Sequence, residues 1–180
     1  EEPFKMLAVT LGADPFIGRI LTGRVESGTL KMGETVKALN MDGTVVESFR
    51  ATKILAFRGL AQTPIDVAEA GDIVSLAGMT KATVADTLCD VSVEQAIPAQ
   101  PIDPPTISVT FGINDSPLAG RDGKKVQSRV IRDRLMKEAE TNVAIKVTDT
   151  PGGEAFDVAG RGELQMGVLI ENMRREGFEL

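Results

Sequence analysis

The sequence predicts two domains, an all-β domain followed by a mixed α+β domain. Residues 4–91 are short runs of strand-forming residues separated by turns, with no helical periodicity. Residues 94–105 contain four prolines, which disfavour both a helix and a central strand. Beyond them, apolar residues recur at helical spacing in two segments. We therefore place a β domain at 1–93, a stiff, extended linker at 94–105 and an α+β domain at 106–180.

The strand-like runs of the first domain follow one another about every 8 to 12 residues, a spacing that favours a sandwich or a small barrel. The turns between them are rich in Gly and Asp, as at Ser27-Gly28 and Asp42-Gly43. Strands are expected at 4–12, 17–26, 34–40, 44–59, 63–67, 72–78 and 86–91.

The segment Gly18–Val36 is predicted to be a β-hairpin, with one strand, a tight turn at Gly28 and a returning strand. Side chains along the first of these strands alternate between two faces, as pleating requires. Gly23 interrupts that strand with a residue that has no side chain. A glycine in mid-strand predicts a bend or the close approach of another backbone, and the strands of a barrel need such sharp coiling to close.

The second domain is predicted to alternate strands and helices. The expected elements are a strand at 106–111, a helix at 126–140, strands at 142–147 and 155–158, and a helix at 162–176. The apolar side of the first helix comprises Val126, Val130, Ile131, Leu135 and Ala139. The order β-α-β-β-α is typical of a ferredoxin-like split β-α-β fold that stops at Phe178-Glu179-Leu180, where a last strand would begin.

The helix at 162–176 has the clearest pattern in the chain. Its apolar stripe comprises Met166, Leu169, Ile170 and Met173. Glu163 lies near the positive end of the helix dipole, and Arg174 and Arg175 lie near the negative end. Gly177 is placed to end the helix.

Both ends of the chain indicate a piece of a longer protein. The sequence begins Glu1-Glu2-Pro3 with no methionine, and it stops where the final strand of the second domain would begin. We therefore expect a fragment.

Composition excludes several classes of protein. A hydrophobic content of 42% with 26% charged residues is typical of a globular chain. No apolar run approaches the roughly 18 residues of a membrane span, so we expect a soluble, cytoplasmic protein with no membrane partner. Cys89 is the single cysteine and there is no histidine, which excludes a disulfide framework and His-based catalysis or metal binding.

No catalytic, cofactor or metal site is predicted. The string Gly120–Lys125 lacks the spaced first Gly and the Ser or Thr of a P-loop. Gly160–Glu163 favours a tight strand-to-helix turn over a phosphate loop. The carboxylate pairs Asp86 with Asp90 and Glu138 with Glu140 are interpreted as solvated surface, because no nucleophile or orienting base accompanies them. Asp103, Asp115 and Asp122 match no Ca²⁺ loop.

The net charge of −6 means that any contact with nucleic acid must come from a local patch. One patch is clear, because Arg121–Arg134 holds six basic residues against two acidic ones. It starts in a long, polar, Gly-rich loop, where Arg121, Lys124 and Lys125 are suited to phosphate oxygens.

The patch continues into the helix that follows. Arg129 and Arg132 in its first turns are weaker candidates for phosphate contact. The alternative is helix-surface pairing of Arg129 with Asp133 and of Arg134 with Glu138. In the β domain, the sequence pattern by itself indicates that Arg24 and Arg58 are outward-facing charges on half-exposed strands.

Six stretches of the chain together resemble the TypA/BipA branch of translational GTPases. They are GRILTGRVESGTLKMGETV, ATKILAFRGL with EAGDIVSLAGM, DTLCD, FGINDSPLAGRDGKKVQSRVIRDRL and AGRGELQMGVLIENMRREGFEL. The first alone is similar to the β-barrel that follows the nucleotide-binding domain in elongation factor Tu. The last two are specific to the branch, although Gln165 and Met166 stand where it more often has His and Leu.

The resemblance implies a barrel like domain 2 of elongation factor Tu, followed by a ferredoxin-like domain like domain III of elongation factor G. It implies a central piece without the GTPase domain or the carboxyl-terminal domain, so that GTP and Mg²⁺ belong to the parent protein and the piece is not an enzyme. Such domains dock on rRNA and ribosomal proteins and relay nucleotide state between the ends of the molecule. Full-length relatives are linked to stress response and to assembly of the large ribosomal subunit. The resemblance also makes Arg24 and Arg58 candidates for RNA contact.

Three alternatives stay open. The chain could be the equivalent piece of elongation factor G, which the loop AGRDGKK disfavours. It could be a protein-binding adaptor unrelated to RNA, or an enzyme acting with carboxylates. Salt dependence separates ribosome binding from adaptor function. Binding through phosphates weakens steeply as ionic strength rises, whereas an apolar protein interface barely responds.

Overall fold

The computed structural model describes residues 2–180, which divide into two compact units. The first unit ends at Pro101 and the second comprises Ile102–Leu180, so the division falls inside the proline-rich stretch at 94–105. The start of that stretch packs on the first unit. Ile97 is buried there, and its backbone N–H donates to Thr87 Oγ1 at 2.8 Å.

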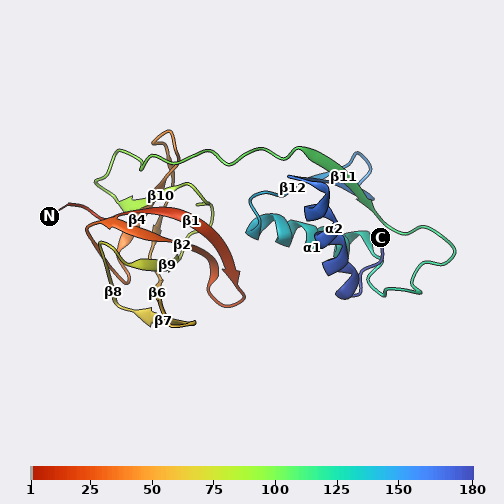
Figure 1. The fold of residues 1–180 in the computed structure, drawn as a ribbon, viewed down its shortest axis with the longest axis horizontal. Helices are drawn as coiled ribbons and strands as arrows, with labels where there is room; N and C mark the ends of the chain where they lie inside the picture. The colour runs from red at the N-terminus through yellow and green to blue at the C-terminus, as the bar shows by residue number, and fades with distance from the viewer. Residues whose placement is uncertain (1) are drawn as a thin grey trace. The chain divides into compact units, whose positions relative to one another are not determined.

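The first unit is built from antiparallel strands (Figure 1). They are β1 (Lys5–Asp14), β2 (Gly18–Ser27), β3 (Thr29–Lys31), β4 (Thr35–Leu39), β5 (Val45–Arg50), β6 (Lys53–Arg58), β7 (Ala61–Ile65), β8 (Val67–Glu69), β9 (Ile73–Ala77) and β10 (Thr87–Asp90). Eight of them form one sheet in the order β5-β4-β10-β1-β2-β9-β6-β7, and β3 pairs with β8. The sheet curls around the main apolar core of the unit, in which nearly every strand buries a side chain, as in the predicted barrel. Leu39, Cys89 and Val93 form a second, smaller cluster.

At Gly23 the backbone of β1 approaches β2 closely. A Cβ on Gly23 would lie 2.0 Å from the carbonyl oxygen of Leu7, so no side chain fits there. The β1–β2 ladder shifts register between Ala8 and Thr10, opposite Gly23, which leaves Val9 as a bulge. The predicted close backbone approach at Gly23 is confirmed.

The predicted hairpin at Gly18–Val36 is wrong. The turn at Gly28 is present, with φ of +71°, but the strands on its two sides do not pair with each other. β2 is bonded to β1 on one edge and to β9 on the other. Because both edges of β2 are occupied, the returning chain pairs elsewhere, β3 with β8 and β4 with β10 and β5.

The run 44–59, expected as one strand, is two strands that turn a corner at Ala51. The side chain of Ala51 is fully buried and its N–H donates to the Glu34 carbonyl at 2.9 Å. Gly78, with φ of +122°, passes so close that a Cβ would lie 2.1 Å from the Arg50 carbonyl oxygen. The corner therefore depends on a segment far away in sequence, which local pattern does not reveal.

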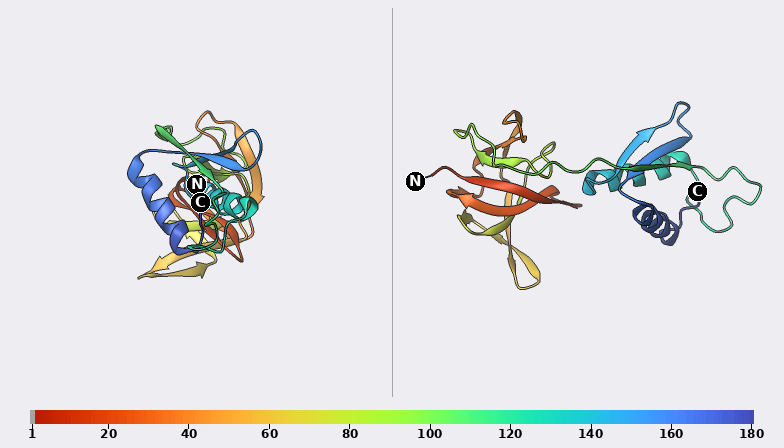
Figure 2. Two further views of the ribbon diagram at one scale, coloured as in Figure 1. Left: turned by 90° about the vertical axis from the view of Figure 1, so that its right-hand side faces the viewer. Right: turned by 45° about the horizontal axis from the view of Figure 1, so that its top comes forward.

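The second unit contains β11 (Ile107–Gly112), α1 (Ser128–Thr141), β12 (Lys146–Asp149), β13 (Ala155–Gly160) and α2 (Glu163–Arg175). Its sheet order is β11-β13-β12, with β13 antiparallel to both neighbours (Figures 1 and 2). β11, α1 and β12 thus form a β-α-β unit with a third strand inserted. The strand predicted at 142–147 begins later, because Asn142 ends α1 and accepts a bond from the N–H of Ile145.

One core joins both helices to the sheet. It contains Phe111, Ile131, Leu135, Ile145, Phe156, Val158, Met166, Leu169, Met173 and Phe178. Ile170, expected in the apolar stripe of α2, is 40% exposed, so that part of the prediction is wrong. The predicted glycine cap is confirmed, since Gly177 has φ of +86°, Phe178 N–H donates to the Met173 carbonyl and Gly177 N–H to that of Arg174.

Asp86 is also not the surface residue that the sequence suggested. It is 6% exposed, and Oδ2 accepts from the N–H of Thr83 at 2.8 Å. Burial raises its pKa, against the opposing effect of the Thr83 amide. Asp86 therefore helps to hold the segment between β9 and β10 in place, rather than interacting with solvent.

Glu47 holds the same segment from β5. Its carboxylate accepts bonds from the amides of Thr80, Lys81 and Ala82 at 2.6–3.1 Å. Burial works against ionisation, but these donors outweigh it and leave the pKa of Glu47 below its usual value. The ionised form of Glu47 is therefore part of the folded structure.

We expect Gly23→Ala to destabilise the first unit by about 3 kcal/mol, because the added methyl group collides with rigid backbone. The matched control is Gly12→Ala, where nothing lies within 4 Å of an added Cβ. Urea unfolding followed by circular dichroism measures both. Equal losses in the two variants would contradict the packing argument.

Glu47→Gln should lower the unfolding free energy near neutral pH, and this loss should vanish in acid. Since the folded-state pKa lies below the usual 4.5, the stabilisation is complete above pH 4.5 and disappears as pH falls through the folded-state value. The pKa of the neighbouring Asp86 is raised rather than lowered, so its ionisation changes stability with the opposite sign. The quantity to measure is therefore the difference in unfolding free energy between variant and wild type across pH. A difference that stays constant down to about pH 2 would refute this account. Glu26→Gln, an exposed carboxylate on β2, controls for net charge.

Candidate nucleic-acid interface

The predicted basic loop, residues 114–125, connects β11 to α1 and extends away from the sheet of its own unit (Figure 1). Arg121, Lys124 and Lys125 are all exposed. With Glu176 and residues 120, 122, 123 and 177, they line a hollow of about 400 Å³. The loop therefore offers several cations around a concave surface, which suits an anionic group such as a phosphate.

The second half of the loop is attached to the chain that follows α2. Lys125 forms a parallel bridge with Phe178, and its N–H donates to the Gly177 carbonyl at 3.0 Å. The Lys125 ammonium lies 4.7 Å from the centroid of the Phe178 ring, a cation–π contact. Gly123 is buried against the same segment, where a Cβ would lie 2.8 Å from the Gly177 carbonyl oxygen.

The carboxylate of Glu179, in the chain that follows α2, is also hydrogen-bonded to the loop. It accepts bonds from Asn114 Nδ2 at 2.5 Å and from the amides of Gly120, Asp122 and Gly123 at 2.9–3.2 Å. The Gly123 amide is the largest of the influences that lower the pKa of Glu179. No sequence motif marks this residue, since it lies 54 positions beyond the end of the loop, and it was not among the predicted site residues.

The predicted site residues differ in how free their charges are. Arg121 and Lys124 make no ion pair among residues 2–180, whereas Lys125 is engaged with the Phe178 ring. Arg132 forms a two-bond ion pair with Asp149, at 2.8 and 3.0 Å, across α1 and β12. Its charge is thus largely neutralised on the protein itself.

The helix-surface pairs were predicted partly correctly. Arg134 does pair with Glu138 at 2.9 Å and adds a second partner, Glu176, at 2.7 Å. Arg129 is exposed and does not pair with Asp133 among the ion pairs of the described chain. Arg129 therefore remains available beside the loop.

Arg24 and Arg58 belong to the first unit. Arg24 is exposed on β2, opposite Leu7 on one side and Ile73 on the other. Arg58 ends β6 beside the fully exposed Leu60 at the hairpin tip. The two arginines lie on different strands of the sheet, with β9 between them.

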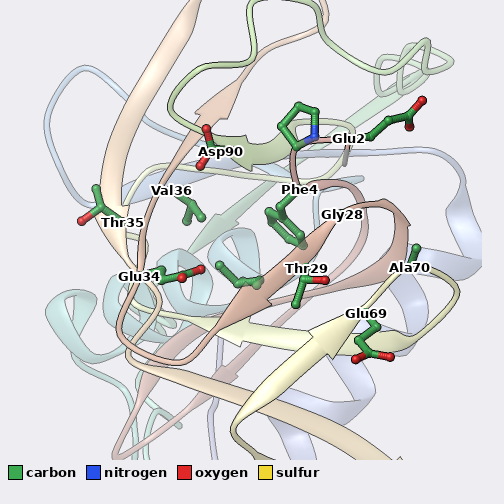
Figure 3. Close-up of a pocket in the computed structure, with 12 residues that line it drawn as sticks. Glu2, Phe4, Gly28, Thr29, Glu34, Thr35, Val36, Glu69, Ala70 and Asp90 are labelled. Carbon is green, nitrogen blue, oxygen red and sulfur yellow. The ribbon is translucent and has the colours of Figure 1, made fainter.

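A cavity of about 790 Å³ in the first unit is chemically different from the loop (Figure 3). Its apolar floor includes Phe4, Leu30 and Val36. The charged residues that line it are all acidic: Glu2, Glu34, Glu69 and Asp90. A site of this sign repels phosphate, so the cavity is not part of a nucleic-acid interface.

Within residues 2–180, no helix combines the length and apolar character needed to cross a membrane. Across the same residues, no group of three potential metal ligands gathers at one point. In the strand-to-helix turn at Gly160–Glu163, the Arg161 N–H donates to Gln165 Oε1 at 2.8 Å.

Comparison with known proteins gives consistent matches. The family model described as elongation factor Tu domain 2 matches residues 18–89, within the strands of the first unit. Proteins named large ribosomal subunit assembly factor BipA are similar to the whole chain. The protein from Bacillus subtilis is 45% identical over 100% of this chain, that from Synechocystis 44% over 99%, and that from Escherichia coli K12 44% over 99%. The chain spans 29–30% of the length of these relatives.

Proposed function

Because this chain belongs to the TypA/BipA family of translational GTPases, we propose that it docks a ribosome-assembly factor on ribosomal RNA through the basic loop. The observation that carries the proposal is the exposure of Arg121 and Lys124, without ion-pair partners in the described chain, at the rim of a hollow. In an acidic protein, such a patch is where phosphate can bind. The names of the relatives support the ribosome as the partner.

The contacts we propose position the protein rather than read sequence. Arg121, Lys124 and the neighbouring Arg129 supply charge to phosphate oxygens, and the described chain has no Trp or Tyr on which bases could stack. Arg132 contributes less, since Asp149 neutralises it. Arg24 and Arg58 would make separate contacts from the first unit, with rRNA or with ribosomal proteins.

We also propose that the second unit has a ferredoxin-like fold. Its sheet order β11-β13-β12, with β13 antiparallel to both neighbours, supports this assignment. A last strand in that fold would lie beside the free edge of β11. The resemblance to domain III of elongation factor G rests on the same topology.

The wider role follows from the same family. The 180 residues carry no P-loop string, so we propose that GTP and Mg²⁺ bind to a GTPase domain of a longer parent and that this piece transmits nucleotide state without catalysing a reaction. The site of action would be the cytoplasm, with a part in stress response. The relatives do not favour a piece of elongation factor G, a protein-binding adaptor or a carboxylate enzyme.

Salt dependence is the first test. If about three cations each contact a phosphate, affinity for purified large ribosomal subunits should fall roughly 40-fold between about 50 mM and 200 mM salt. Co-sedimentation of the full-length protein across this range measures the slope. Affinity that is insensitive to salt would favour an apolar protein interface instead.

The second test reverses charge in the loop. Arg121→Glu combined with Lys124→Glu should weaken binding to large subunits strongly and reduce the salt slope by about two, because two phosphate contacts are lost. These residues are preferred to Lys125, whose contact with Phe178 is structural. The matched control reverses two exposed lysines of the same unit, Lys137 and Lys146. Equal effects of the two double variants would rule out the loop as the contact.

A further inference from the structure

The basic loop is folded around an anion that belongs to its own chain. One carboxylate, that of Glu179, receives one side-chain amide and three backbone amides of the loop, all at 3.2 Å or less. Backbone N–H groups that converge in this way form a nest, which is a binding site for anions. Here the chain supplies the anion itself.

Convergence of amides on one point needs a permissive backbone and a partner. Gly120 has φ of +84°, a conformation that residues with a side chain rarely adopt. Gly123 is buried so closely against residues 177 and 178 that it leaves no room for a Cβ. The loop is thus bent inward at both glycines, and the side chains between and beside them, Arg121 and Lys124, are exposed.

The carboxylate is delivered by the end of α2. Gly177 ends the helix, Phe178 is buried in the core of the unit, and the Glu179 N–H donates to the Lys125 carbonyl at 3.4 Å. Residues 177–179 therefore bond to the loop through both backbone and side chain. The conformation of the loop depends on the chain that follows α2.

We propose that Glu179 is a positioning residue for phosphate binding, which holds the loop amides inward and so presents Arg121 and Lys124 in a fixed arrangement. This inference rests on the proposed function, which supplies the ligand, the phosphates of ribosomal RNA. Ordering the loop in advance removes part of the entropy cost that binding would otherwise carry. It also ties the contact surface to the segment after α2, so a displacement of residues 177–179 would disorder the surface.

Simple electrostatics and positioning make opposite predictions for this residue. Glu179 is a negative charge beside the basic loop, so its neutralisation should strengthen phosphate binding if charge alone matters. If Glu179 positions the loop, its neutralisation weakens binding, because a glutamine presents an NH₂ group to amides that need acceptors. The sign of the effect therefore decides between the two.

The test compares Glu179→Gln with Asp115→Asn, which removes the same charge from the same loop. Asp115 is exposed and accepts no hydrogen bond in the described chain. In the 180-residue chain, NMR hydrogen exchange is measured at the amides of Gly120, Asp122 and Gly123. In the full-length protein, affinity for purified large ribosomal subunits is measured at low salt.

We expect Glu179→Gln to speed exchange at these three amides by tenfold or more and to weaken subunit binding about fivefold, while Asp115→Asn leaves exchange unchanged and binding equal or slightly tighter. Unchanged exchange in Glu179→Gln, or binding as tight as that of the wild type, would overturn the proposal. If the wild-type protein fails to bind subunits, the proposed function fails, and the exchange data still decide whether Glu179 holds the loop. Unchanged amide signals from α1 and β13 show that the variant is folded.

Discussion

Carboxylates that accept hydrogen bonds from backbone N–H groups hold the loops of this protein. Asp14 accepts from two residues of the β1–β2 turn, Glu47 from three residues before β10, and Glu179 from three residues of the basic loop. Amides in loops lack the partners that a helix or sheet provides, and a buried or half-buried amide without an acceptor is costly. Many of the acidic residues in this chain therefore do structural work, and the net charge of −6 reveals less about binding partners than its size suggests.

Carboxylates also pair with some of the cations in the second unit, which distinguishes the basic loop from the helix that follows it. Arg132 and Arg134 are paired with Asp149, Glu138 and Glu176. Arg121 and Lys124 of the loop, in contrast, are exposed and make no ion pair among residues 2–180. In the first unit, the charged residues that line the cavity of about 790 Å³ are all carboxylates (Figure 3). Which cations lack an ion-pair partner depends on where charges are neutralised, rather than on how many there are.

The secondary structure was largely predictable, and the failures share a cause. Strands and helices came from residues a few positions apart, so α2 and the coiling at Gly23 were found from local pattern. The hairpin at Gly28 failed because the edges of β2 are taken by β1 and β9, which lie elsewhere in sequence. The corner at Ala51 depends on Gly78 for the same reason. Asp86 was predicted to lie on the surface, but it is buried, and its carboxylate accepts a hydrogen bond from the Thr83 N–H.

For the candidate site, sequence alone determined the position of the loop, its basic side chains and the family of which its motif is typical, because these are properties of residue order. Only the tertiary structure decided which charges are free. Arg129 lacks its expected partner, Arg132 finds Asp149 on β12, and Glu179 reaches the loop from the end of α2. A hydrogen bond forms only between groups within about 3 Å of each other. Local spacing cannot report that proximity when the partners are separated by whole elements of the fold.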